Sequence, residues 1–477
     1  STVPLPSGWA WLAPETEAAS TGAFPAVYTP ADPANYCSVE RDLTVTVQSE
    51  SAPEAPGTSG GSGGDTGDSS GDTSGSGEGT GGSGGGSGSS GGGSAGSNGS
   101  AASSGSVSTE QSGGSASVTT IAPASTVVDG TAVAAVSSSD MAEAVAQART
   151  GGSGEVVIAP KTAGDLERVQ VSIPAWSVGQ VGSRTGADLT IRTPIASVTV
   201  ANRSLAGLSA SGGSVVAAVE HTGGSVYALS ITAGGRAVES LDGGVTLRLP
   251  CPGADPGTVA VLLQDDGSRL VLRRSAAVDG VLTVPLSGPA QVEIVSNGRS
   301  FDDVSASSWA YGAVSFASGH GLFSGTGANT FSPDLNMTRG MLAAVLHNLA
   351  DNPDSAHSAA FSDVDSGVYY ADAVAWAFEQ GIVSGYGSGV FGAEDSVTRE
   401  QLAVMLYRTA GSPSAGNGGS GGFADSEAIG GYASTAMDWA VETGIINGVG
   451  NGRLDPQGLA TRAQVAQMLK NYVESRF

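Results

Sequence analysis

The sequence predicts a multidomain protein, with β-sandwich-like N-terminal parts, a disordered Gly/Ser linker and an all-α C-terminal region. Three observations lead to this prediction. Short runs before residue 300 alternate apolar and polar side chains, as half-buried strands do. Residues 51–115 consist almost entirely of Gly, Ser, Thr and Asp, and such a segment buries too little apolar surface to offset the entropy of ordering. Residues 301–477 contain one helical pattern three times.

Residues 1–50 contain the pattern of strands that end a β domain. RDLTVTVQ places Leu43, Val45 and Val47 on one face, and PAVYTPADPANY places an aromatic strand before a turn. With GWAW, these runs resemble the last strands of a bacterial immunoglobulin-like domain. Because the chain opens at Ser1 without a methionine, we expect the earlier strands, and any signal peptide, to lie upstream.

Residues 116–298 predict a β-rich, sandwich-like module. Its strands are expected in EVVIA, RVQVSI, DLTIRT, SVTV, SVVAAVE, SVYALSIT and VTLRL. One helix is expected, with a capping-box-like start at Asp140 and a stop at Gly151. Two dipeptides suit hairpin turns, which require positive φ: Asp266-Gly267 and Asp279-Gly280.

Residues 301–477 repeat with a period of about sixty. Each copy opens with Phe and Asp, continues with an aromatic residue and a helical apolar face, reaches a glycine-bounded turn, and ends with Thr-Arg before a second apolar helix. The phenylalanines are expected in the core. The aligned positions are Phe301, Phe361 and Phe423; Asp303, Asp363 and Asp425; Trp309, Tyr369 and Tyr432; Gly325, Gly385 and Gly448; and Arg339, Arg399 and Arg462.

This ordered motif set resembles the S-layer homology family, with copies at 301–357, 358–416 and 420–477. The resemblance implies three helix–loop–helix prongs in a pseudo-threefold arrangement, with binding grooves between the prongs. It also implies non-covalent binding of a secondary cell-wall polysaccharide, often one with ketal-linked pyruvate. The expected location is therefore extracellular, at the cell wall or in a surface layer.

The arginines of the three Thr-Arg pairs are the strongest candidates for ligand binding. The threonine before each apolar run is expected to cap a helix, which places the arginine in the first turn, where the helix dipole disfavours a cation. Arg339, Arg399 and Arg462 are therefore expected to meet an anion, such as the carboxylate of a pyruvate ketal, with free helix amides nearby. The alternative is that each arginine pairs with an aspartate of its repeat.

The other repeated positions are expected to contact the sugar or to hold the loops. Trp309, Tyr369 and Tyr432 are expected to stack on a sugar ring, and Gly325, Gly385 and Gly448 to let the backbone approach it. Asp303, Asp363 and Asp425 are expected to cap loops rather than to touch the ligand, although ligand contact stays open. Where the family usually has Glu, this chain has Gln401 and Gln464, which can complete a capping box, and Met341, which cannot.

Composition excludes several functions. The net charge is −25, and lysine occurs only at Lys161 and Lys470, which disfavours nucleic acid and anionic membranes as partners. No apolar run is long enough to span a membrane. No nucleophile arrangement or carboxylate dyad is recognisable, so no catalysis and no metal or other cofactor are expected in this chain. The four histidines are expected in loops or on the surface, and pairing of Cys37 with Cys251 stays open.

The leading hypothesis is a non-catalytic surface protein, held on cell-wall polysaccharide by its C-terminal repeats and spaced from the wall by the Gly/Ser linker. One alternative is the anchor of a surface enzyme, for example a glycan hydrolase, whose catalytic domain lies upstream. A second alternative is a surface-layer subunit that self-associates through its β domains. The sequence does not identify the glycan or the occupied groove.

Overall fold

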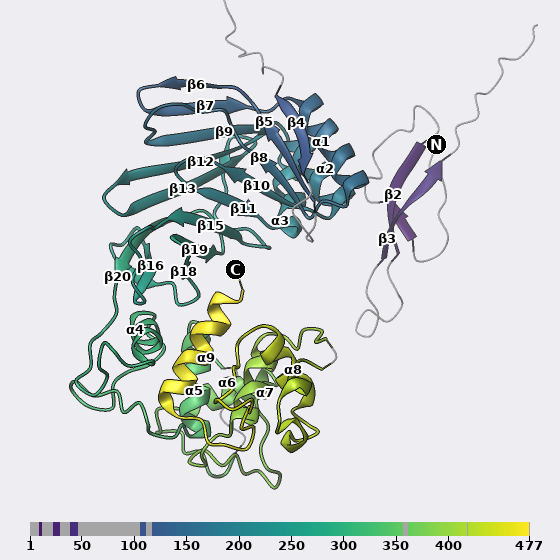
Figure 1. Ribbon diagram of the computed structural model, residues 1–477. Helices are drawn as coiled ribbons and strands as arrows, with labels where there is room; N and C mark the ends of the chain where they lie inside the picture. Colours follow the sequence, from purple (N-terminus) through teal and green to yellow (C-terminus); the bar gives the residue numbers. More distant parts are fainter. Residues whose placement is uncertain are drawn as a thin grey trace, which may run out of the picture. The chain divides into compact units, whose positions relative to one another are not determined.

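The computed structural model describes strands between residues 9 and 45, then residues 105–110, 117–355, 361–416 and 418–476 (Figure 1). Two units, Ser1–Ala95 and Gly96–Phe477, are compact by themselves. Most of the predicted linker, 51–104, and Cys37 lie outside the described residues. The linker was predicted to extend to residue 115. This is wrong for residues 106–110, because they form strand β4 (Ser106–Glu110), which pairs antiparallel with β5 (Val118–Ala122).

The N-terminal unit contains one antiparallel sheet. Its strands are β1 (Trp9–Trp11), β2 (Gly22–Tyr28) and β3 (Val39–Val45), paired in the order β1-β2-β3. This sheet agrees with the strands predicted over residues 1–50. The immunoglobulin-like character of the unit stays a prediction.

The β-rich module is built from two sheets, as the strand runs predict. The eight-stranded sheet contains β18 (Ala276–Val278), β19 (Val281–Leu286), β15 (Val245–Pro250), β11 (Ser197–Val200), β10 (Asp188–Arg192), β8 (Glu155–Ile158), β5 and β4, in this order. The nine-stranded sheet contains β17 (Arg269–Val271), β16 (Thr258–Leu263), β20 (Gln291–Ser296), β13 (Val226–Ala233), β12 (Ser214–Gly223), β9 (Arg168–Pro174), β7 (Thr131–Ala135) and β6 (Ser125–Val128), with β14 (Arg236–Ala237) on β13.

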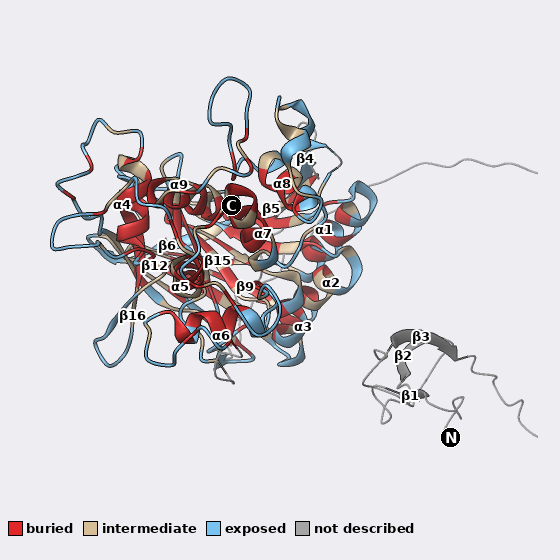
Figure 2. Ribbon diagram, turned by 90° about the horizontal axis from the view of Figure 1, so that it is seen from below, coloured by how far each residue is buried: buried red, intermediate tan, exposed pale blue. Residues whose placement is uncertain are grey.

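The module departs from a plain sandwich because some neighbouring strands are parallel. β8 pairs parallel with both β5 and β10, and β7 pairs parallel with β9. Parallel neighbours need a crossover, and helices α1 (Ser138–Gly151) and α2 (Ala175–Thr185) supply it by returning the chain from the second sheet to the first. Helix α3 (Asn202–Ala210) packs against α2. Side chains from both sheets and these helices form one core, drawn red in Figure 2.

The structure tests two local predictions for the module. The hairpin at Asp279-Gly280 is confirmed, with φ of 50° and 77°. The N-cap of α1 is Ser137, whose hydroxyl accepts from the amide of Asp140. Asp140 was expected to start that helix, but it lies within it, buried, and accepts a hydrogen bond from Gly105 N at 2.8 Å. Helices α2 and α3 were not predicted.

The C-terminal region contains two helices per repeat. They are α4 (Tyr311–Gly319), α5 (Arg339–Leu349), α6 (Ala371–Glu379), α7 (Arg399–Thr409), α8 (Ser434–Glu442) and α9 (Arg462–Glu474). The packed pairs cross the repeat boundaries: α5 with α6, α7 with α8, and α9 with α4. The last repeat thus closes on the first, as a pseudo-threefold arrangement requires.

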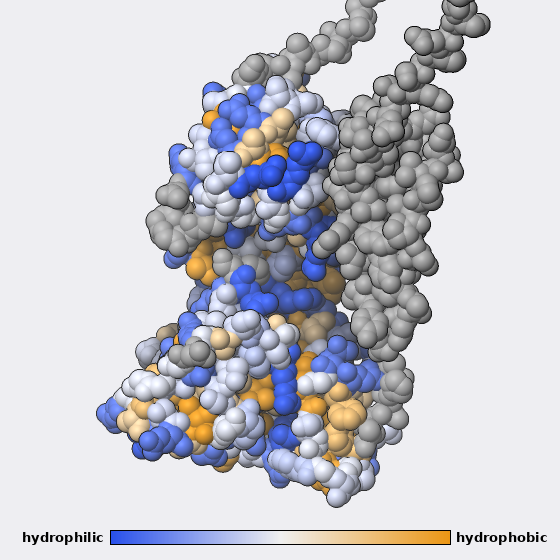
Figure 3. Space-filling model, turned by 90° about the vertical axis from the view of Figure 1, so that its right-hand side faces the viewer, coloured by the Kyte–Doolittle hydropathy of each residue, from blue (hydrophilic) through white to orange (hydrophobic). Residues whose placement is uncertain are grey.

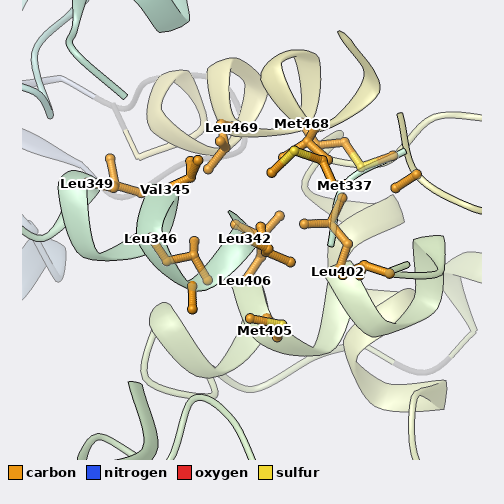
Figure 4. Close-up of a cluster of buried hydrophobic side chains, with 14 of the residues drawn as sticks. Met337, Leu342, Val345, Leu346, Leu349, Leu402, Met405, Leu406, Met468 and Leu469 are labelled. Carbon is orange, nitrogen blue, oxygen red and sulfur yellow. The ribbon is translucent and has the colours of Figure 1, made fainter. Parts of the chain in front are cut away.

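Backbone hydrogen bonds close the same cycle at the centre. Met337 N donates to Ala460 O, Ala460 N to Val397 O, and Val397 N to Met337 O, each at 2.9 Å. Apolar side chains from α5, α7 and α9 meet around these residues (Figure 4). The second helices of the three repeats therefore share one core, so no repeat buries its apolar face alone.

The β module is joined to the first repeat by close packing. Asn297 Nδ2 donates to Gly319 O at 2.7 Å, and Asp351 accepts from Arg274 Nη2 at 3.1 Å. His320, expected in a loop or on the surface, is instead fully buried here. Its Nδ1 lies 2.8 Å from Phe316 O and its Nε2 lies 2.9 Å from Ser275 O. Burial lowers the pKa of His320 to about 4, although both carbonyls favour the protonated ring.

Glycine makes this joint possible, which gives a test. A Cβ on Gly257 would lie 2.5 Å from Gly298 Cα, whereas a Cβ on Gly253, in the same loop, would meet nothing within 4 Å. We expect Gly257→Ala to lower the free energy of unfolding of the whole chain by about 1–3 kcal/mol. Gly253→Ala should change it by less than about 0.5 kcal/mol. Equal urea midpoints for the two variants would contradict a tight joint.

Candidate functional site

The three arginines bridge neighbouring repeats. Each is nearly buried, with exposed fractions of 7%, 3% and 7% for Arg339, Arg399 and Arg462. In each, Nε and Nη2 donate to two carbonyl oxygens in the next repeat around the cycle. The acceptors are Phe391 O and Ser384 O for Arg339, at 3.0 and 2.9 Å; Leu454 O and Asn447 O for Arg399, at 2.7 and 2.8 Å; and Phe331 O and Ser324 O for Arg462, both at 2.8 Å.

These bridges leave one donor group on each guanidinium. Among the described residues, no Nη1 of the three arginines has a hydrogen-bond partner, and none of these atoms is enclosed. Burial is the largest cause that lowers the pKa of Arg399 and of Arg462, while nearby groups, including Asp425 and Asp303, favour the charged form. The arginines therefore combine a structural bridge with an available Nη1.

The expected free helix amides are not available. Thr338 is the N-cap of α5, and its hydroxyl accepts from Met341 N. Arg339 N and Gly340 N donate to Asp395 O and Ala393 O, from the loop that precedes α7. The same pattern recurs at α7 and α9, where Gln401 and Gln464 also complete the predicted capping boxes. An anion at these sites must therefore bind side chains and not the helix ends.

The repeated aspartates fasten a loop within each repeat, as expected. Asp303 accepts from Phe331 N and Ser332 N at 2.8 and 2.7 Å. Asp363 accepts likewise from Phe391 N and Gly392 N, both at 2.7 Å. Asp425 accepts from Leu454 N and Asp455 N, both at 2.9 Å, and from Arg453. The proposed pairing of these aspartates with the three repeat arginines is therefore wrong.

The repeated glycines also have contacts within their own repeats. A Cβ on Gly385 would lie 2.5 Å from Val390 O and 2.7 Å from a ring carbon of Phe361. Corresponding contacts surround Gly325 and Gly448. The absence of a side chain at this position lets the turn pack on the core phenylalanine. This packing alone explains why each repeat has a glycine there. Contact of the three glycines with a ligand stays a prediction.

The aromatic residues at the repeat starts lie at the surface. The exposed fractions are 66% for Trp309, 71% for Tyr369 and 62% for Tyr432. Tyr432 OH donates to Glu400 at 2.7 Å, and Glu400 is itself buried and also accepts from Gly430 N. Burial, followed by this hydrogen bond, raises the pKa of Tyr432. Its ring is thus held in place while one face stays accessible.

Two grooves between repeats contain two of these aromatic residues, Trp309 and Tyr432, whereas Tyr369 lines neither groove. The Arg399 groove, of about 410 Å³, is lined by Trp309, Arg399, Ile445, Asn447, Gly448, Val449, Gln464, Gln467, Met468 and Asn471. The Arg339 groove, of about 300 Å³, is lined by Arg339, Ile382, Val383, Ser384, Gly385, Tyr386, Gln401, Val404, Met405, Arg408 and Tyr432. Both sizes fit small-ligand sites. Each groove combines one repeat's arginine, the next repeat's turn and second helix, and the third repeat's aromatic residue.

Several lining residues were missed by the sequence reasoning. Gln401, Met405 and Arg408 follow each other at four and three residues along α7 and so share one face. Their counterparts Gln464, Met468 and Asn471 do so on α9, and Gln467 is one turn after Gln464. A search for polar residues at this spacing after Thr-Arg would have found them. Tyr386 and Asn447 lie in turns and carry no such signal.

The third arginine has a related but different environment. Arg462 lies 4.6 Å from the ring centre of Phe331 and 5.1 Å from that of Phe323. Tyr369 lies close enough for the charge of Arg462 to lower its pKa, although burial raises that pKa more. Met341 stands here in place of the glutamines of the two grooves. The three positions are therefore not equivalent.

A family profile described as the S-layer homology domain matches residues 300–340, 360–403 and 422–466. The chain is 27% identical over 250 residues to an amylopullulanase of Thermoanaerobacterium thermosulfurigenes, covering 50% of this chain and 13% of that protein. It is 28% identical over 184 residues to Exoglucanase XynX of Acetivibrio thermocellus, covering 38% and 17%. It is 26% identical over 196 residues to the Surface-layer 125 kDa protein of Lysinibacillus sphaericus, covering 40% and 16%. The chain thus spans less than a fifth of each relative.

The matched domain and the surface-layer relatives identify an extracellular, cell-wall-associated protein. Within the described part of the chain, no helix has the length and apolar character needed to cross a membrane. On the face seen in Figure 3, apolar side chains lie in separate patches between hydrophilic ones.

The arginine bridges predict a large effect on stability. Arg462→Ala should lower the free energy of unfolding by about 3 kcal/mol, because two carbonyls lose charge-assisted hydrogen bonds. Arg236→Ala, at an exposed position of the β module, should change it by less than about 0.5 kcal/mol. Urea unfolding followed by helical circular dichroism measures both. An unchanged midpoint for Arg462→Ala would show that the bridge is not structural.

The aspartates predict loss of stability in acid. Burial raises the pKa of Asp303, but the amides of Phe331 and Ser332 lower it more, so its folded pKa is below the unfolded value of about 3.9. The stabilisation is therefore complete above the unfolded pKa and is lost as the pH falls through the folded pKa. We expect the melting temperature of Asp303→Asn to fall less than that of the wild type between about pH 4 and pH 2.5.

Asp165→Asn, at an exposed position without these amides, is the matched control and should show the wild-type decline. Protonation of His320, with its folded pKa of about 4, lowers stability mainly between that value and about pH 6.5, and the wild type and both variants share this loss. Parallel acid profiles of Asp303→Asn and wild type would contradict the role given to Asp303.

Proposed function

Because residues 300–466 of this chain carry three S-layer homology domains, which anchor proteins to the cell wall, we propose that the grooves between them bind an anionic wall polysaccharide without a covalent bond. The anionic substituent we propose is a carboxylate, such as that of a sugar-linked pyruvate ketal. In this role the chain itself is not catalytic.

One observation carries this proposal. The two grooves are lined by three arginines and by no aspartate or glutamate, in a chain whose net charge is −25. A generally acidic chain repels polyanions at long range. Local arginines that have no carboxylate partner can still bind an anion over a short distance, where charge-assisted hydrogen bonds form.

The geometry suggests how binding works. The carbonyl bridges fix each guanidinium before the ligand arrives, so little rotamer entropy is lost on binding. Nη1 then donates to the carboxylate. Trp309 and Tyr432 offer ring faces to the apolar side of a sugar. A polymer that engages more than one groove gains from effective concentration, because the grooves are held on one closed unit.

The relatives favour a second candidate for the protein as a whole. Two of them are named as enzymes, an amylopullulanase and an exoglucanase, and the similarity covers only a small share of each. The chain could equally serve as the wall anchor of an enzyme whose catalytic domain lies outside this sequence. A surface-layer subunit is the third candidate, favoured by the relatives named as surface-layer proteins. All three share the anchoring step.

Sedimentation with wall sacculi tests the anchoring. The purified chain should sediment with intact sacculi and not with sacculi stripped of their non-peptidoglycan polymer. Trp309→Ala should weaken binding about two- to tenfold, the range expected for one lost aromatic contact. Trp176→Ala is the matched control, since this tryptophan is equally exposed, at 64%, on α2 of the β module. Equal sedimentation with stripped sacculi would overturn the proposal.

A further inference from the structure

Arg408 distinguishes one groove from the other two repeat interfaces. It lies near the end of α7, where α5 has Asn348 and α9 has Asn471. All three side chains bind a backbone carbonyl at the same place in the glycine-bounded turn. Arg408 Nη1 donates to Ile382 O at 3.3 Å, Asn348 Nδ2 to Leu322 O at 3.1 Å, and Asn471 Nδ2 to Ile445 O at 3.2 Å. The position is therefore structurally equivalent, and only its charge differs.

Arg408 adds a second guanidinium to the Arg339 groove. Its Nε and Nη2 have no hydrogen-bond partner among the described residues, and no carboxylate there pairs with it. Arg339 lines the same groove with an unused Nη1. Two carboxylates lie nearby: Asp395 is beside Tyr386, and Glu400 is buried under Tyr432. Neither lines the groove.

Two cations in one groove disfavour each other unless an anion lies between them. Tyr386 strengthens the effect of the two charges. The centre of its ring lies 4.8 Å from the guanidinium carbon of Arg339, so the ring shields one side of this guanidinium from water. At the corresponding position the Arg399 groove has Val449. The Arg339 groove is thus the more strongly cationic of the two.

The Arg399 groove offers a different chemistry. Besides its single arginine, it is lined by the amides of Asn447, Gln464, Gln467 and Asn471. Part of this amide surface is used within the protein, because Gln467 Nε2 donates to Asn471 Oδ1 and Asn471 Nδ2 donates to Ile445 O. Gln464 Nε2, Gln467 Oε1 and Asn447 Oδ1 have no partner among the described residues. An amide donor and two amide acceptors suit the hydroxyl and acetamido groups of an uncharged sugar. Trp309 provides a ring face for that sugar.

We propose that the grooves divide the ligand between them: the Arg339 groove selects the carboxylate-bearing sugar through Arg408, and the Arg399 groove takes an uncharged, amide- or hydroxyl-rich sugar. This inference rests on the proposed function. It goes further by assigning the charge preference to one groove and to one residue that the other repeats lack.

The test uses the full chain and two small probes. The first is a methyl glycoside of N-acetylglucosamine with a 4,6-linked pyruvate ketal, and the second is its methyl ester, in which a methyl group caps the carboxylate and removes the charge. Calorimetry should give the wild type a preference of about tenfold or more for the acid, the range of one charge-assisted hydrogen bond. Arg408→Asn, which installs the residue of the other repeats, should remove most of this preference, although Arg339 still lines the groove.

A reciprocal variant provides a second, independent test of the charge assignment. Asn471→Arg places a second guanidinium in the Arg399 groove, and in the Arg408→Asn background it should restore the preference for the acid. Both variants should melt within a few degrees of the wild type, because either side chain can bind the turn carbonyl.

The outcomes separate the two proposals. If wild type and Arg408→Asn prefer the acid equally, the division between grooves is wrong, even when sedimentation with sacculi persists. If restoration by Asn471→Arg fails although Arg408→Asn has lost the preference, the assignment of charge to this helix position is wrong. If the chain sediments equally with stripped sacculi, the proposed function itself fails.

Discussion

The buried guanidinium that joins each repeat to the next is the contact on which the C-terminal region depends. Because the acceptors are carbonyl oxygens, the bridge satisfies hydrogen bonds without cancelling the positive charge. A bridge to a carboxylate would have held the repeats together equally well, but it would have left a neutral groove. The same side chain thus closes the three repeats into one unit and provides the cation at their interfaces.

This arrangement requires that the nearby aspartates be occupied elsewhere. Each repeated aspartate accepts two amides of its own loop, which fixes the loop whose carbonyl then receives the arginine of the preceding repeat around the cycle. Phe331 shows both contacts: its amide donates to Asp303, and its carbonyl accepts from Arg462. The carboxylate and the guanidinium therefore bind the amide and the carbonyl of one residue, in two adjacent peptide groups, and neither neutralises the other. Contacts within a repeat and between repeats are coupled through that loop.

The sequence predicted what depends on local pattern. Threonine caps located α5, α7 and α9, and alternation located most strands of the β module. It failed for α2 and α3, because Gly179 and Gly182 in α2 and Gly207 in α3 weaken a helical pattern. In the structure the two glycines of α2 let the helices approach: a Cβ on Gly179 would lie 2.8 Å from Ser209 Cβ. The arginine partners were also beyond prediction, since they lie 45 to 138 residues away in the chain.

The three repeats differ at positions on the second helix whose side chains are only partly buried or exposed. The arginine bridge, the aspartate contacts and the glycine of the turn recur because a change at any of them would break contacts of the closed cycle. The arginines are buried, each aspartate accepts hydrogen bonds from two loop amides, and a Cβ on each glycine would collide with a carbonyl oxygen. The second-helix face is partly open, and there the chain has Met341, Gln401 and Gln464, or Asn348, Arg408 and Asn471, without altering the helices. The three repeats therefore share the residues that hold the cycle together. The residues that would contact a ligand can differ between the interfaces at little cost in stability.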